Sequence, residues 1–196
     1  MEAHDIVRFN QAAYLDIDWP DWFEPTAEPV FATVRRDSLK EGLLPVGLRG
    51  KQRNQRFAFE LAVELVADVI HPWSLIGKNS FRHAEILNFP AYQAYLQARI
   101  LLQGTKWGVG GSLGFELATD QPTVKKTSDF DVLLYAKEPA ELPLKVIQQH
   151  PEFFQPLDVQ VITAKGGFAL KEYLQHPDKK ILLKTINGPI LTNELW

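Results

Sequence analysis

The sequence predicts a mixed α/β (α+β) protein built from two units, and three observations lead to this prediction. From residue 105 onward, short apolar strands alternate with helices, as they do where helices pack on a sheet. Residues 30–50 instead have the alternation of two strands joined as a hairpin. Between these regions, residues 71–90 have Pro near both ends and no clear period. We therefore expect an N-terminal unit over residues 1–85 and a C-terminal unit over residues 86–196.

The composition is that of an ordinary folded protein and excludes several kinds of chemistry. The 196 residues are 45% hydrophobic and 23% charged, with a net charge of −3 and no Cys. Without Cys there is no disulfide, zinc–thiolate site, iron–sulfur cluster or cysteine nucleophile. No basic start leads into an apolar run, and no apolar stretch is long enough to span a bilayer. We expect a cytoplasmic protein that binds neither a membrane nor nucleic acid, because its basic residues form only one short segment.

The N-terminal unit is expected to combine a small sheet with a helix. VFATVRR (30–36) alternates as a strand does, and GLLPVGLRG (42–50) follows it as a hairpin partner. The run that follows Asn54, QRFAFELAVELVADVI, has apolar residues at spacings of three and four. That spacing predicts a helix, which His71-Pro72 would end.

The C-terminal unit is expected to alternate helices and strands throughout. A helix over 91–104 leads into a strand over 105–109, and Asn187-Gly188 near the end of the chain favours a tight hairpin turn. Between them we predict, in order, a helix over 110–118, a strand over 128–136, a helix over 138–150, a strand over 156–163, a helix over 168–176 and a strand over 179–186.

Gly110-Gly111-Ser112 stands between a predicted strand and a predicted helix. Paired glycines let a ligand approach the backbone closely, and a helix N-terminus offers free N–H groups to a phosphate. The Ser112 hydroxyl could add a hydrogen bond. The same three residues are also common in plain turns, and no Walker A lysine follows them.

Three acids occur on the predicted strands that follow. Asp129 and Asp131 are two apart, so on one strand they would share a face and repel each other unless a cation lay between them. A strand that emerges from a polar loop would explain them equally. Asp158 stands alone between Leu157 and Val159, on a strand that we expect to be buried, where an unpaired carboxylate is costly. Carboxylates gathered on neighbouring strands suit metal-assisted phosphoryl transfer.

The order of these features resembles the nucleotidyltransferase superfamily of the DNA polymerase β type: Gly-Gly-Ser, 16 residues, Asp-x-Asp, then a later strand Asp. The strings GSLGFELAT, SDFDVLLYA, LDVQVIT and LLKTINGPILTNELW are similar to the malonate decarboxylase holo-acyl-carrier-protein synthase family. His4-Asp5, VRR (34–36), LPVGLRG and Gln55-Arg56 resemble that family's N-terminal unit. Asp120 departs from the small residue expected at its position, which we interpret as a loop difference.

This resemblance implies a nucleotidyltransferase fold for the C-terminal unit and a phosphoribosyl-dephospho-CoA transferase activity. Such an enzyme takes triphosphoribosyl-dephospho-CoA and attaches the phosphoribosyl-dephospho-CoA group to a serine of the apo acyl carrier protein subunit of malonate decarboxylase, releasing pyrophosphate. The resemblance implies that Asp129 and Asp131 hold one or two Mg²⁺ ions. It implies that Asp158 is the third catalytic and metal-binding carboxylate, and that Gly110, Gly111 and Ser112 bind the triphosphate.

Cationic groups are also needed, because charge accumulates on a pyrophosphate leaving group. The segment 35–56 carries seven bases against Asp37 and Glu41. Such a stretch can be merely a solvated surface, and it could equally steer an acidic carrier protein to the enzyme. The candidates for binding the substrate phosphates are Lys126, Lys184, Arg49, Arg53 and Arg56.

Two other functions stay open from the sequence. An adenylyltransferase that uses ATP on a protein or small molecule would need the same C-terminal features, although not the N-terminal motifs. A non-catalytic binding module with this fold is the other, although such modules usually lack one of the acids, and all three are present here.

Overall fold

The computed structural model describes residues 1–9, 17–23, 29–50, 52, 54–78, 83–176 and 178–196. Contacts divide the chain into one unit of Met1–His71 with Ile186–Gly188 and a second of Pro72–Thr185 with Pro189–Trp196. The first boundary, at His71–Pro72, falls earlier in the chain than residue 85. None of the described helices has both the length and the apolar character that crossing a bilayer requires.

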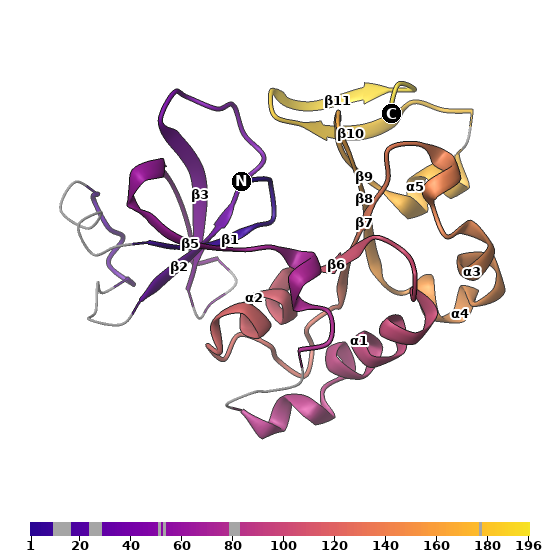
Figure 1. Ribbon diagram of the computed structural model, residues 1–196, viewed down its shortest axis with the longest axis horizontal. Coiled ribbons are helices and arrows are strands. Elements are labelled where there is room, and N and C mark those ends of the chain that lie inside the picture. The colour runs from indigo at the N-terminus through magenta and orange to yellow at the C-terminus, as the bar shows by residue number, and fades with distance from the viewer. Residues whose placement is uncertain (10–16, 24–28, 51, 53, 79–82, 177) are drawn as a thin grey trace. The chain divides into compact units, whose positions relative to one another are not determined.

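The N-terminal unit contains a five-stranded sheet with the order β4-β3-β2-β1-β5, drawn in indigo and purple in Figure 1. Its neighbouring strands are antiparallel, and the β2–β3 hairpin that the sequence predicts is confirmed by the pairing of Thr33 with Gly47. The elements are β1 (Ile6–Phe9), β2 (Val30–Val34), β3 (Leu43–Arg49), β4 (Arg56–Ala62), the 3₁₀ turn η2 (Val63–Leu65) and β5 (Val66–Ile70).

The helix predicted after Asn54 is wrong, because that segment forms β4, η2 and β5. Phe57, Phe59 and Leu61 alternate with Ala58 and Glu60, which is the period of a strand. The interruption at η2 changes the phase of the apolar positions, so that across the whole run they fall at spacings of three and four. The α+β expectation for this unit is therefore corrected: its described part is a sheet with one 3₁₀ turn, η2, and no α-helix.

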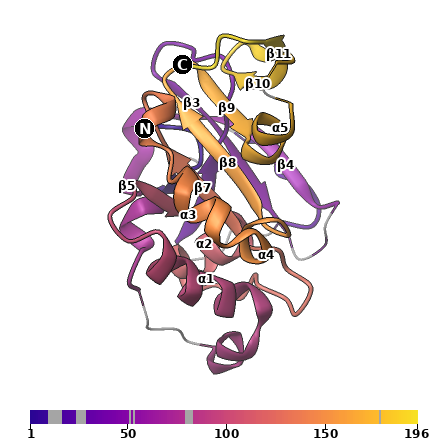
Figure 2. The same ribbon diagram turned by 90° about the vertical axis from the view of Figure 1, so that its right-hand side faces the viewer.

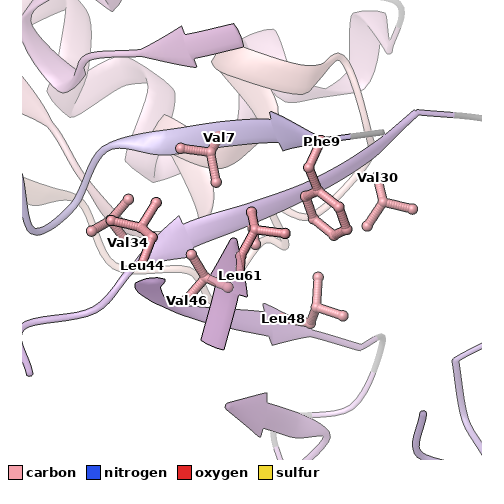
Figure 3. Packing of buried hydrophobic residues seen from close by; sticks show 9 residues of the cluster. Val7, Phe9, Val30, Val34, Leu44, Val46, Leu48 and Leu61 are labelled. Carbon is pink, nitrogen blue, oxygen red and sulfur yellow. The ribbon is translucent and has the colours of Figure 1, made fainter. Parts of the chain in front are cut away.

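One face of this sheet carries the core of the unit. Figure 3 shows the buried side chains of β1 to β4 directed toward one another. Partly buried aromatic rings, including Trp19, Phe57 and Phe59, pack against this cluster. The cluster consists of Val7, Phe9, Val30, Ala32, Val34, Leu44, Val46, Leu48 and Leu61.

The N-terminal motifs lie on adjoining strands. The backbones of His4-Asp5 and Val34 exchange two hydrogen bonds, at 3.0 and 2.8 Å, and Arg35 N–H donates to Pro45 O at 2.8 Å. Asp5 is fully buried, and its carboxylate accepts the Glu2 N–H at 2.8 Å and lies 2.9 Å from His71 Nδ1. Asp5 therefore ties the start of β1 to the residue that follows β5.

The C-terminal unit is a six-stranded sheet with the order β11-β10-β9-β8-β7-β6 and with helices against it. Figure 2 shows α3 and α4 in front of β7 and β8. The strands are β6 (Trp107–Val109), β7 (Asp131–Tyr135), β8 (Asp158–Thr163), β9 (Gly166–Ala169), β10 (Ile181–Thr185) and β11 (Gly188–Thr192). The helices are α1 (Pro90–Leu101), α2 (Gly111–Thr119), α3 (Leu144–Gln149), α4 (Pro151–Phe154) and α5 (Leu170–Gln175), with 3₁₀ turns η3 (Pro72–Leu75), η4 (Ala84–Asn88) and η5 (Pro139–Glu141).

Most of the predicted elements of this unit are confirmed, with boundaries moved by a few residues. The expected helix over 138–150 is shorter, because Pro143 and Pro151 restrict the backbone, and Pro151 begins the separate α4. β9 was not predicted, and it forms a hairpin with β8 through the pairing of Thr163 with Gly166. β7 and β8 are parallel, with η5, α3 and α4 in the connection between them.

Close packing and a buried hydroxyl hold the first strand of this sheet. A Cβ on Gly108 would overlap Pro72, and a Cβ on Gly114 would overlap the Val109 carbonyl, so η3 and α2 both approach β6 closely. The Tyr95 hydroxyl of α1 donates to Leu75 O at 3.1 Å and accepts the Gly77 N–H at 2.9 Å. Burial raises the pKa of Tyr95, which keeps this hydroxyl protonated and able to donate.

We expect Asp5→Asn to lower the free energy of unfolding by about 1–3 kcal/mol, because one buried acceptor beside His71 is replaced by a donor. Urea denaturation measures this change. The matched control is Asp37→Asn, since Asp37 is 43% exposed and pairs with Arg35 at 3.1 Å, where an ion pair contributes little. Equal effects of the two substitutions would contradict a structural role for Asp5.

Candidate active site

Two of the predicted acids lie directly opposite each other. Asp131 is the first residue of β7, Asp158 is the first residue of β8, and the two are register partners in this parallel pair. Paired residues on neighbouring strands are about 4.8 Å apart and point to the same face. Like charges in this position repel each other, so the arrangement favours a bound cation.

Asp158 is exposed, which corrects the expectation of a buried carboxylate. The expectation came from the apolar neighbours Leu157 and Val159, and Val159 is indeed buried. Because Asp158 begins its strand, its side chain lies at the open end of the sheet and keeps its contact with water. The cost of desolvation therefore gives no argument for a ligand here, and the argument is instead the close approach of Asp131.

Gly110 and Gly111 bring the start of α2 against this pair. Gly110 N–H donates to the Asp131 carbonyl at 3.0 Å. Gly111 has a φ of +61°, and a Cβ at this position would overlap the Asp131 carboxylate. Only glycine meets both conditions without strain. The strand–Gly-Gly–helix order predicted from the sequence is confirmed, and it places a carboxylate beside a helix N-terminus.

The first turn of α2 offers hydrogen-bond donors at this end of the sheet. The first N–H groups of a helix have no partner within the helix, and the macrodipole makes that end positive. Ser112 is the second residue of α2 and is half-buried. A carboxylate pair that can hold a cation next to a helix start that can hold an anion is suited to a metal-bound phosphate chain.

Glu116 is a residue of this site that the sequence analysis missed. It is 3% exposed, and its Oε2 accepts the N–H groups of Thr123 and Val124, both at 2.8 Å. The Thr123 hydroxyl in turn donates to Ser112 O at 2.9 Å. These bonds hold the loop between α2 and β7 against the start of α2. An acid on the otherwise apolar face of GSLGFELAT was the available signal.

The loop then turns once before it reaches β7. Lys125 N–H donates to Ser128 Oγ at 2.9 Å and Ser128 N–H donates to Lys125 O at 3.0 Å, so Lys126 lies at an exposed turn. Asp129 follows it, exposed, and the buried Phe130 separates it from β7. The strand begins at Asp131 and not at residue 128. The sequence predicted that Asp129 and Asp131 share one face of a regular strand. Because Asp129 precedes the strand, they do not.

The carboxylates do not form a three-ligand metal cage. Within the described ranges, no group of three or more His, Asp or Glu side chains is close enough to hold a metal ion. The pair Asp131–Asp158 fits Mg²⁺ nonetheless, because this ion binds through one or two carboxylates and takes water and substrate phosphates as its other ligands. The pair supplies hard oxygen donors at the first residues of two neighbouring strands.

Lys184 is not brought to this pair. It lies on β10 opposite Gly167, which pairs with Ile162, which in turn pairs with Tyr135. Lys184 is therefore three strands away from Asp131 across the sheet and four residues away along the strand direction. At ordinary strand spacings this separates the two residues by roughly 20 Å. A lysine side chain does not span that distance.

The candidate arginines belong to the N-terminal unit. Arg49 and Arg56 are exposed and lie directly opposite each other on β3 and β4, and Arg53 falls outside the described residues. Gly50 N–H donates to Gln55 O at 2.9 Å beyond this pair, and the Trp22 ring covers Gly50. The structure therefore brings two of the three arginines together at one end of a hairpin.

We expect Glu116→Ala to lower the free energy of unfolding by about 2–4 kcal/mol, because two backbone N–H groups lose their acceptor inside the protein. Urea denaturation gives the total, and amide hydrogen exchange at Val124 reports the loop itself. The control Glu141→Ala removes the acceptor of one exposed N–H, that of Lys137, and should cost less than about 1 kcal/mol. Unchanged exchange at Val124 would contradict the role given to Glu116.

Comparisons with known proteins agree with this division and reach nearly the whole chain. The family model for the phosphoribosyl-dephospho-CoA transferase MdcG N-terminal domain matches residues 2–72, and the model for the C-terminal domain of the same family matches residues 79–194. No solved structure matches the chain.

Curated relatives are similar over the same extent. A protein named phosphoribosyl-dephospho-CoA transferase from Klebsiella pneumoniae subsp. pneumoniae is 33% identical over 98% of this chain and 95% of its own length. Proteins of the same name from Pseudomonas syringae pv. tomato and Azotobacter vinelandii are 32% and 28% identical, over 98% and 100% of this chain and 92% and 94% of theirs. The chain therefore belongs to the phosphoribosyl-dephospho-CoA transferase family.

Proposed function

We propose that this chain transfers the phosphoribosyl-dephospho-CoA group from triphosphoribosyl-dephospho-CoA to a serine of the apo acyl carrier protein subunit of malonate decarboxylase, with release of pyrophosphate. The observation that carries this proposal is the Asp131–Asp158 pair beside the N-terminus of α2. Membership of the transferase family supports the chemistry of the donor. The acceptor and the nucleotidyltransferase-type fold rest on the motif resemblance.

The donor's triphosphate is proposed to lie against Gly110, Gly111 and Ser112. N–H groups in the first turn of α2 and the Ser112 hydroxyl donate to its oxygens, and the missing side chain at Gly111 lets it approach Asp131. Glu116 acts indirectly, because it fixes the loop that ends at Asp129 and ties it to Ser112 through Thr123. Lys126 lies on that loop and is proposed to approach the leaving pyrophosphate.

Asp131 and Asp158 are proposed to hold Mg²⁺ with the phosphate oxygens, and Asp129 is proposed to complete the set when substrate is present. When bound, the ion neutralises charge that develops on the phosphoryl group and on pyrophosphate. Asp158, the more exposed of the pair, is proposed to orient the acceptor serine and accept its proton. The serine Oγ–P bond forms at the phosphorus next to the ribose while the P–O bond to pyrophosphate breaks.

The reaction itself is tested by intact-mass spectrometry of the apo acyl carrier protein. Incubated with this chain, Mg²⁺ and triphosphoribosyl-dephospho-CoA, the carrier should gain the mass of one phosphoribosyl-dephospho-CoA unit, and EDTA should abolish the gain. A parallel incubation supplies ATP as the only nucleotide. Gain of AMP there, with no gain from the precursor, would assign an adenylyltransferase instead. No gain in either incubation would favour a binding module without activity.

The carboxylate pair is tested by Asp158→Asn. We expect turnover to fall by about 10³-fold or more, from the usual cost of losing charge stabilisation in a transition state. In metal-free buffer the free energy of unfolding should stay equal or rise, because the repulsion between Asp158 and Asp131 is relieved. Calorimetry with and without Mg²⁺ measures this.

Two further variants sharpen that test. Asp129→Asn should lower turnover similarly if Asp129 joins the metal site in the complex, while near-normal turnover would restrict the site to Asp131 and Asp158. Glu138→Gln, on an exposed acid after the other end of β7, is the matched control. An Asp158→Asn protein that is unstable yet active would overturn the proposed role of the pair.

A further inference from the structure

The N-terminal sheet carries a row of arginines on the face opposite its core. Arg49 pairs with Arg56 across β3 and β4, and Arg8 pairs with Phe31 across β1 and β2. β2 pairs with β3 at Thr33–Gly47 and Val34–Val46, so Phe31 and Arg49 each lie two residues beyond the Thr33–Gly47 pair, on the same face of the sheet. One set of side chains on this face therefore extends over four strands. We name it the arginine row: Arg56, Arg49, Phe31 and Arg8.

The positive charge at the Arg49–Arg56 end of the arginine row is not neutralised within the described part of the chain. Arg8, Arg49 and Arg56 are exposed, and none of them forms an ion pair with a described carboxylate, but Arg8 is the register partner of Asp68 on β5. Neighbouring bases are different, since Arg35 pairs with Asp37 at 3.1 Å and Lys40 pairs with Glu60 at 2.7 Å. Like charges directly opposite on antiparallel strands destabilise a sheet. Arg49 and Arg56 thus carry a cost that an external anion would remove.

The surface beside the row carries little side-chain bulk. Gly47 and Ala58, the next facing pair along β3 and β4, have almost no side chain. The aliphatic part of the Arg35 side chain lies over Gly47, where a Cβ would be 3.3 Å from its Cδ. Four neighbouring strands span about 14 Å. The charges are therefore spread over a width much greater than that of one phosphate group.

This shape favours a protein as the ligand over a phosphate. Phosphate sites are usually concave and use backbone N–H donors, whereas strand N–H groups here are engaged in the ladders on either side of β3. Guanidinium groups spread over several strands are suited instead to several carboxylates presented by a partner's surface, with Phe31 as an apolar contact among them. Such complementarity raises the rate of encounter and orients the partner.

We propose that the arginine row is the docking surface for an acidic face of the acceptor protein, an inference that rests on the proposed function. The N-terminal unit would then select the acceptor, and the C-terminal unit would carry the transfer chemistry.

The test uses Arg49→Glu/Arg56→Glu in the full chain. This variant exchanges one like-charged pair for another, so the electrostatic cost within the sheet is retained while the sign of the surface is reversed. We expect the KM for the apo acceptor to rise by about tenfold or more, while the KM for triphosphoribosyl-dephospho-CoA is that of the unmodified chain. The acceptor KM of the unmodified chain should also rise with salt, and that of the variant much less.

The matched control is Lys145→Glu/Lys171→Glu, which changes the net charge equally on exposed helical positions of the other unit. An equal rise in the acceptor KM for both variants would overturn the proposal, because net charge alone would then explain it. A rise in the KM for the precursor with an unchanged acceptor KM would overturn it too and would assign the row to substrate phosphates.

Direct binding separates failure of this proposal from failure of the proposed function. Titration calorimetry with the apo acceptor and no donor measures docking without chemistry. Salt-sensitive binding that Arg49→Glu/Arg56→Glu abolishes would support the docking surface even if no group is transferred. Transfer that proceeds with an unchanged acceptor KM in this variant would overturn the docking surface and leave the proposed function standing.

Discussion

The parallel pairing of β7 with β8 is the constraint on which the rest of the candidate site depends. It sets Asp131 directly opposite Asp158, where the repulsion between the two carboxylates costs stability that the proposed cation would restore. Burial of the next pair in the same register, Val132 and Val159, offsets this repulsion and keeps the strands paired. The apolar positions that stabilise the strands thus also hold two charges that repel each other.

The second part of the site is built from backbone and from small residues. Gly111 leaves room for the Asp131 carboxylate, and Gly114 allows α2 to lie against β6. The N-terminus of α2 consequently stands close to the carboxylates, so the proposed cation site and the proposed phosphate site share one end of the sheet. Glu116 supports this arrangement, because its buried carboxylate accepts hydrogen bonds from the loop that leads into β7.

The sequence predicted the C-terminal unit well because its elements there depend on local signals. Strand and helix periods are clean around Gly110 and Asp131, and Asn187-Gly188 does form the turn of a hairpin, with φ of +100° at Gly188. The helix predicted within residues 56–70 was wrong because two short strands and a 3₁₀ turn together place apolar residues at the spacing of a helix. The position of Lys184 depends on strand order, which no local pattern contains.

The exposure of Asp158 also could not be predicted from the local sequence pattern. Its neighbours in sequence indicate a buried strand, whereas its environment is decided by where the connection through α3 and α4 ends and β8 begins. Likewise, nothing in the sequence alone indicates that Arg49 faces Arg56. That pairing follows from the length of the hairpin loop, which sets the register of β3 against β4.

The β7–β8 register also limits where residues can be inserted or deleted in this chain. Because strand side chains alternate, a slip of one residue between Asp158 and Val161 would turn the acid toward the face on which Val159 is now buried and Val159 toward the face that Asp158 now occupies. Residues can be gained or lost in the connection around η5 and α3, where a longer loop costs little. The same change inside β8 would remove the acid from the site at once. Insertions and deletions are therefore tolerated in the connection between the two acids and excluded within the strands that carry them.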